Sequence, residues 1–271
     1  MPRKFGQHFL IDRSVAARIV DAAQISAGDA VVEVGPGRGA LTHVIADSTP
    51  TSLTLIEIDP ALAADLRTLF VLRQWVSVIE ADARTFDPTL LPGGAERPYK
   101  LLANLPYYAA APIIRNFLES ARPPLSAVVM VQREVAAEMA AKPGEMGLMS
   151  VGVQLYADVE VLFDVPPTAF RPPPKVTSTV VRLTVLPQPR LNVASRAEFF
   201  EVVRAGFRAP RKQLRNSLAL GLNIDPADAA ASLISSNIDP ERRPATLTIS
   251  DWGMLYEVVR KPAHSQAVVV T

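Results

Sequence analysis

The sequence has 271 residues, 49% of them apolar, and a formal net charge of +1, which allows one large hydrophobic core and a smaller second domain. It contains no cysteine and only three scattered histidines, so disulfides, thiolate catalysis and clustered metal ligands are excluded, and we expect no metal. Because the sequence shows neither a long apolar run nor a secretory signal pattern, we expect a soluble, cytoplasmic protein that does not enter a membrane.

From residue 30 onward, short runs rich in valine, isoleucine and leucine alternate with segments of helical spacing. These runs predict buried strands over residues 30–34, 52–58, 75–80, 99–104 and 125–131. After the second run, Asp59 and Pro60 form a typical helix start, a capping residue followed by a first-turn proline. Two further strands are predicted over residues 159–165 and 175–185, the last as an antiparallel partner. The pattern predicts an α/β fold with a largely parallel sheet.

A proline-rich segment that begins at Leu186 predicts a domain boundary near residue 188. Beyond it the pattern is helical: Ser195 and Glu198 predict a capping box, and Asp225 with Pro226 predicts another helix start. We therefore divide the chain into a sheet domain of residues 1–188 and a small helical domain of residues 189–271.

Positive charge is concentrated between residues 170 and 220, where ten lysines and arginines stand against two acids. Arg204 and Arg208 are one turn apart on a predicted helix, which we expect Pro210 to interrupt. This charge predicts contact with a polyanion, although a solvated surface would explain the charge alone equally well. The candidate phosphate-binding residues are Arg204, Arg208, Arg211, Lys212 and Arg215.

The first predicted strand runs directly into a glycine-rich loop that contains Gly35 and Gly37. Such a loop lets a ligand approach the backbone at a helix N-terminus, and its GxGxG spacing differs from the GxGxxG of dinucleotide-binding proteins. Glu57 ends the second strand, where an acid can accept hydrogen bonds from both hydroxyls of a ribose. Asp82 follows the third strand and is placed to meet an adenine amine, or else to cap a helix. The loop and the acids predict an adenosine-containing ligand.

The motif NLPYY begins at Asn104, at the end of the fourth predicted strand. An exocyclic adenine amine is a poor nucleophile because its lone pair is delocalised into the ring. The Asn104 side-chain oxygen and the following backbone carbonyl can accept both N–H hydrogens and direct the lone pair at a methyl donor. Tyr107 can stack on a base removed from its helix. A strand-ending turn with core tyrosines is the alternative interpretation.

These segments together resemble the ribosomal RNA adenine dimethyltransferase family over residues 3–220. The matching stretches are GQHFL (6–10), VEVGPGRGALT (32–42), LIEID (55–59), EADA (80–83), NLPYY (104–108), VVMVQREVAAEM (128–139), AFRPPPKVTSTVVRL (169–183) and RKQLRNSL (211–218). The resemblance implies a class I S-adenosylmethionine methyltransferase fold, with a seven-stranded Rossmann-like sheet and a helical C-terminal domain.

The resemblance also implies roles for individual residues. Tyr107 and Phe170 would hold the target adenine between them, and Asn104 with Leu105 would serve its amine. Many family members have Asn where this chain has His8, and the segment after the tyrosines, residues 109–112, is unusually small. The implied cofactor contacts, for S-adenosylmethionine, are His8, Leu10, Gly35, Gly37, Glu57, Asp82 and Asn104.

The segment RKQLRNSL and the helical tail resemble the branch of the family that dimethylates two adjacent adenosines near the 3′ end of 16S rRNA. We therefore expect a monomer that acts on 16S rRNA within an immature small ribosomal subunit, with the basic helical domain binding RNA. The alternatives are the related 23S rRNA methyltransferases of macrolide resistance and a non-catalytic RNA- or DNA-binding factor on the same scaffold. A nicotinamide dehydrogenase is disfavoured by the glycine spacing.

Overall fold

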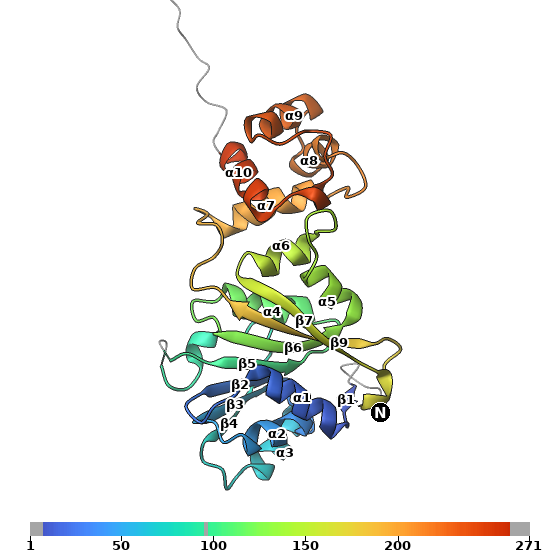
Figure 1. The fold of residues 1–271 in the computed structure, drawn as a ribbon. Coiled ribbons are helices and arrows are strands. Elements are labelled where there is room, and N and C mark those ends of the chain that lie inside the picture. The colour runs from blue at the N-terminus through green and yellow to red at the C-terminus, as the bar shows by residue number, and fades with distance from the viewer. Residues whose placement is uncertain (1–7, 95–96, 261–271) are drawn as a thin grey trace, which may run out of the picture. The chain divides into compact units, whose positions relative to one another are not determined.

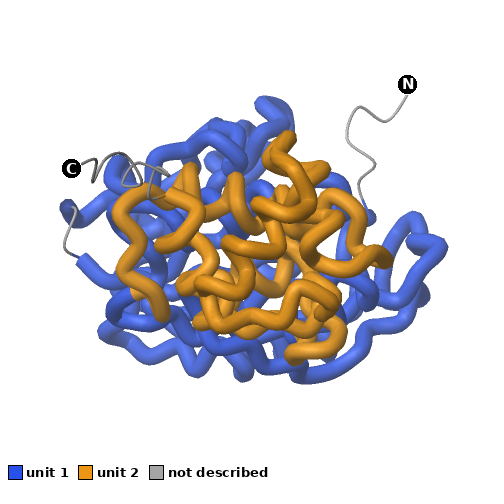
Figure 2. Tube along the Cα trace, turned by 90° about the horizontal axis from the view of Figure 1, so that it is seen from above, with its two compact units in different colours: residues 1–140, 156–188 blue, residues 141–155, 189–271 orange. Residues whose placement is uncertain are grey.

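The computed structural model describes residues 8–94 and 97–260 (Figure 1). The chain forms two compact units, one of residues 1–140 and 156–188 and one of residues 141–155 and 189–271 (Figure 2). The sequence-based division assigned residues 141–155 to the sheet domain, and here the structure differs. Residues 141–155 group with the helical unit, where the backbone N–H groups of Gly144 and Met146 donate to the Ala245 carbonyl at 2.8 and 3.2 Å.

The first unit is built on a seven-stranded sheet in the order β4-β3-β2-β5-β6-β9-β7. Five strands run parallel: β2 (Ala30–Val34), β3 (Ser52–Glu57), β4 (Val76–Glu80), β5 (Lys100–Asn104) and β6 (Ser126–Gln132). Strand β9 (Ser178–Val185) lies between β6 and β7 (Ala157–Val165) and is antiparallel to both. The α/β prediction, its seven strands and the antiparallel pairing of the last one are therefore confirmed.

One hydrophobic cluster of this unit lies between the sheet and three helices. These are α1 (Arg13–Ala23), α2 (Ala40–Asp47) and α3 (Pro60–Leu69), whose buried side chains form one cluster with residues of the strands. The Asp59 side chain caps α3 as predicted, accepting from the N–H groups of Ala61 and Leu62. The remaining helical segments of the unit are α4 (Ala110–Glu119), α5 (Arg133–Met139) and the 3-10 turns Pro88–Leu90 and Pro167–Ala169.

A second, two-stranded sheet joins β1 (Phe9–Leu10) to β8 (Phe170–Arg171) in antiparallel register. Leu10 pairs with Phe170 and Phe9 with Arg171. This small sheet was not predicted, because two-residue strands carry no periodic signal. It brings the N-terminal motif beside the proline-rich segment, although about 160 residues separate the two in the chain.

The second unit is helical. Its core contains the buried rings of Phe199, Trp252 and Tyr256. None of the helices within the described residues is long and apolar enough to cross a membrane. The helices are α6 (Leu148–Gln154), α7 (Arg196–Gly206), α8 (Leu214–Leu222), α9 (Pro226–Ser235) and α10 (Ile249–Val259), with a 3-10 turn at Pro244–Thr246.

Helix α7 ends at Gly206, four residues before Pro210, so the prediction that Arg204 and Arg208 share a helix face is wrong. One tertiary contact holds the chain where the helix ends. The Ser217 hydroxyl donates to the Gly206 carbonyl at 2.5 Å and accepts from the Ala209 N–H at 2.8 Å. A side chain at position 206 would collide with the Trp252 ring, 2.3 Å from an ideal Cβ.

Candidate active site

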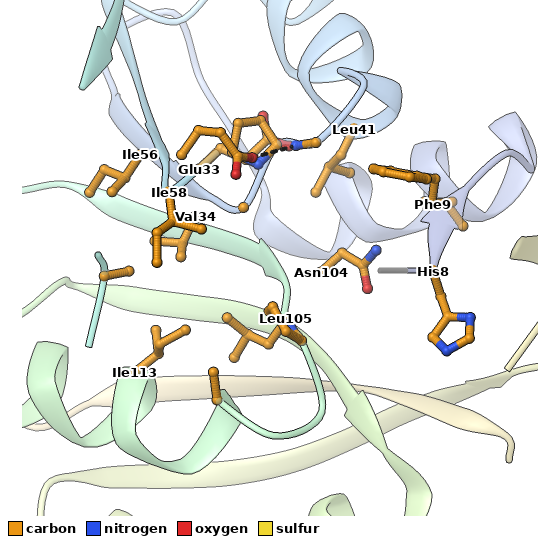
Figure 3. Close-up of a pocket in the computed structure, with 18 of the residues that line it drawn as sticks. His8, Phe9, Glu33, Val34, Leu41, Ile56, Ile58, Asn104, Leu105 and Ile113 are labelled. Carbon is orange, nitrogen blue, oxygen red and sulfur yellow. Dashed lines mark hydrogen bonds between the residues drawn. The ribbon is translucent and has the colours of Figure 1, made fainter. Parts of the chain in front are cut away.

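A pocket in the first unit opens at the carboxyl ends of β2, β3, β4 and β5, where parallel sheets gather their ligands (Figure 3). Residues from the small β1–β8 sheet complete its lining. Gly6 and Gln7 of the first matching stretch lie outside the described residues. The structure brings together every residue predicted for the cofactor and the target base: His8, Leu10, Gly35, Gly37, Glu57, Asp82, Asn104, Leu105, Tyr107 and Phe170.

The glycine-rich loop and Glu57 are joined directly. Gly35 and Gly37 have φ angles of 67° and 57°, which side chains rarely adopt. The Gly37 N–H donates to one carboxylate oxygen of Glu57, and the Asp59 N–H donates to the other, both at 3.0 Å. Glu57 is 3% exposed. Burial raises the pKa of its carboxyl, while these backbone donors oppose the rise. Each oxygen still has a lone pair with which to accept from a ligand hydroxyl.

Sequence reasoning missed Glu33, which also lines this pocket. The residue is 2% exposed, and its Oε2 atom has no hydrogen-bond partner among the described residues. Burial, opposed by the Thr42 side chain and reinforced by the negative charge of Glu57, raises the pKa of Glu33 to about 8. The available signal was a single acid in the otherwise apolar strand 30–34.

Asp82 holds Arg84 at the edge of the pocket. The guanidinium donates to both carboxylate oxygens, at 3.0 Å for the Nε–Oδ1 pair and 2.6 Å for the Nη2–Oδ2 pair, and the Arg84 backbone N–H donates to Oδ1 at 2.9 Å. The side-chain bonds from Arg84 lower the pKa of the Asp82 carboxyl. Asp82 thus organises a turn and caps no helix, and its role toward an adenine amine stays a prediction.

Asn104 ends β5 and lies near the middle of the pocket in Figure 3. Its side-chain amide forms no hydrogen bond with any described residue, so both polar atoms are free to meet a ligand. Two hydrogen bonds fix the backbone that follows Asn104. The Leu105 N–H donates to the Met130 carbonyl at 3.1 Å, and the Ala109 N–H donates to the Pro106 carbonyl at 2.9 Å. An ideal Cβ at Gly35 would lie 3.7 Å from the Asn104 carbonyl oxygen, so the glycine loop and the NLPYY motif adjoin.

The two aromatic residues predicted to hold a base differ in exposure. Phe170 is 3% exposed and belongs to the hydrophobic core, whereas Tyr107 is partly exposed. The Tyr107 ring stacks against the His8 ring with centroids 5.9 Å apart. The predicted enclosure of an adenine between Tyr107 and Phe170 remains a prediction.

The basic residues of the second unit are mostly exposed: Arg204, Arg208, Arg211 and Lys212 face solvent. Arg215 is half-buried, and its guanidinium lies 3.9 Å from the Glu241 carboxylate. Four of the five charges therefore remain accessible to a polyanion. Within the described residues, no group of three or more histidine, aspartate or glutamate side chains could hold a metal ion.

Comparison with known proteins shows which family this chain resembles. Residues 1–261 match the family model "Ribosomal RNA adenine dimethylase". The chain is 41% identical over 261 residues to ribosomal RNA small subunit methyltransferase A of Alkaliphilus oremlandii, covering 93% of this chain and 90% of that protein. It is 39% identical to the protein of the same name from Bacillus cytotoxicus, covering 93% and 89%.

Two solved structures share the fold. A dimethyladenosine transferase from Plasmodium falciparum superposes with a TM-score of 0.76 at 24% identity, covering 92% of this chain and 96% of that one. The 23S rRNA methyltransferase ErmE superposes with a TM-score of 0.68 at 28% identity, covering 92% and 98%. The fold is that of a class I rRNA methyltransferase, and the chain belongs to the ribosomal RNA adenine dimethylase family.

Proposed function

We propose that this protein transfers methyl groups from S-adenosylmethionine to the exocyclic amines of two adjacent adenosines near the 3′ end of 16S rRNA. It would act in the cytoplasm as a monomer, on an immature small ribosomal subunit. The observation that carries the proposal is Asn104, whose side-chain amide has no partner among the described residues and lies in a pocket built at the carboxyl ends of the strands.

The pocket residues fit S-adenosylmethionine. Glu57 keeps lone pairs for the ribose hydroxyls, and the open backbone at Gly35 and Gly37 allows close approach. Glu33 supplies a buried Oε2 atom that has no partner in the described part of the chain and suits the ammonium of the methionine part, since a cation there would offset the cost of a buried carboxylate. The bound cofactor would supply a methyl group on a sulfonium, an electrophile that needs no metal.

The chain's own contribution to the chemistry is to orient the nucleophile. The Asn104 side-chain oxygen and the Leu105 backbone carbonyl would accept the two N–H hydrogens of the adenine amine. That constraint turns the nitrogen lone pair away from the ring and toward the methyl group. Tyr107 would stack on the base, and the buried Phe170 would close the site behind it.

The choice of 16S over 23S rRNA rests on the relatives. The two relatives at about 40% identity are named for the small ribosomal subunit, whereas the 23S enzyme ErmE is 28% identical. The exposed positive charges of the helical unit, Arg204, Arg208, Arg211 and Lys212, support an RNA-binding role for that unit.

Expression in a bacterial strain that lacks its own 16S rRNA dimethyltransferase tests the proposal. Primer extension along 16S and 23S rRNA should show a new stop at two adjacent adenines of 16S rRNA, because dimethylated adenine cannot pair. Asn104→Ala should give no stop at equal protein level. A stop in 23S rRNA would indicate the macrolide-resistance reaction, and no stop in either RNA would favour a non-catalytic binding factor.

A further inference from the structure

The hydroxyl of Tyr107 has a buried partner. It lies 2.8 Å from the Ser178 Oγ atom, and Ser178 is 1% exposed. Ser178 is the first residue of β9 and pairs with Gln132 of β6 on one side and Val165 of β7 on the other. Since an interior strand fixes its position, this serine is a rigid anchor for a ring in the pocket.

A second contact, with the His8 ring, restricts the orientation of the Tyr107 ring. The His8 ring stacks against Tyr107 at an interplanar angle of 29°, and the His8 Nδ1 atom donates to the Pro172 carbonyl at 2.8 Å. His8 is itself held beside β8 by the antiparallel pairing of Phe9 with Arg171. One side of the tyrosine ring is therefore occupied by a side chain that is fixed in place.

Stacking alone does not require a hydroxyl, because a phenylalanine ring offers the same apolar face. Burial raises the pKa of Tyr107, so the phenol stays neutral and keeps its proton. A half-buried hydroxyl without a partner would be costly, and Ser178 satisfies it. The bond links the NLPYY turn to the first residue of the interior strand β9, and thereby fixes the ring's orientation.

We propose that Ser178 is a positioning residue that holds the Tyr107 ring so that the side not covered by His8 receives the target adenine. This inference rests on the proposed function, because it assigns Tyr107 to base stacking. Ser178 would act through Tyr107 and would touch neither the cofactor nor the RNA.

The kinetic test compares Ser178→Ala, Tyr107→Phe and the double variant with the wild type on rRNA substrate. Each single variant removes one end of the same bond, so each should lower kcat by about threefold to tenfold, and the double variant should lose no more. The KM for RNA should change little, because the one base that would stack on Tyr107 is a small part of the protein–RNA interface. Thr179→Val is the matched control: it removes the neighbouring buried hydroxyl of β9, which bonds to Asp164, and should leave kcat unchanged.

A readout without RNA separates this inference from the proposed function. Fluorine NMR of protein containing 3-fluorotyrosine reports on five tyrosines, and the Tyr107 signal is the one lost in Tyr107→Phe. Ser178→Ala should shift this signal, because the Tyr107 ring would exchange among several orientations whose signals average. Thr179→Val should have neither effect. An unchanged signal, or single-variant losses in kcat that add in the double variant, would overturn the inference. An altered signal in a protein whose wild type methylates no RNA would leave the ring anchor supported and refute the proposed function instead.

Discussion

Replacing Glu33 by glutamine should stabilise the folded protein at alkaline pH far more than at acidic pH. Burial raises the pKa of this carboxyl to about 8 in the folded chain, against 4.5 for a solvated glutamate. Between these values the folded protein binds one proton more than the unfolded chain, so stability falls as pH rises. Since one pH unit corresponds to about 1.4 kcal/mol, the wild type should lose about 4 kcal/mol between pH 5 and pH 9 from this group.

Urea unfolding at each pH unit from 5 to 9 measures the effect. The difference in unfolding free energy between Glu33→Gln and the wild type should grow up to about pH 8 and level off above it, at equal m-values. Glu201→Gln, on the exposed face of α7, controls for the removal of one negative charge. A stability difference that does not change with pH would refute the conclusion that burial raises the pKa of Glu33.

Three further predictions concern ligands. Glu57→Ala should weaken S-adenosylmethionine binding by about 1.5 to 3 kcal/mol for each hydroxyl bond lost, and unchanged affinity by calorimetry would refute the ribose assignment. Asn104→Ala should abolish methyl transfer while the unfolding midpoint stays close to wild type; substantial turnover would mean that the amine is held elsewhere. Arg211→Ala combined with Arg215→Ala should weaken RNA binding and reduce the slope of log affinity against log salt by about one to two units. If the plots of log affinity against log salt are parallel for the wild type and the double variant, these charges are only a solvated surface.

The sheet and the pocket could be predicted because local signals determine them. Continuous apolar runs define the parallel strands, and the polar residues that follow them must gather at one edge of a parallel sheet. Glu57 after β3 and Asn104 after β5 were found in this way. The burial of Glu33 is also consistent with its apolar neighbours in β2, although the sequence prediction did not include this residue.

What the sequence could not show depends on contacts between distant residues. The end of α7 is held by the Ser217 hydroxyl, and no local signal near Gly206 indicates this contact. The Ser178–Tyr107 bond joins positions 71 residues apart. The capping box expected at Ser195 is only half formed: its hydroxyl accepts from the Glu198 N–H, while the Glu198 carboxylate accepts from the Tyr256 hydroxyl.

Methyl transfer to adenine in small-subunit rRNA is the central claim. The most direct measurement incubates the purified protein and isotopically labelled S-adenosylmethionine with small and large ribosomal subunits from a strain that lacks the modification. Nucleosides released by nuclease digestion are then identified by mass spectrometry. We predict labelled N6,N6-dimethyladenosine, about two per small subunit, from the wild type and none from Asn104→Ala. Label found only in large-subunit RNA, on another nucleoside, or nowhere at all would contradict this account.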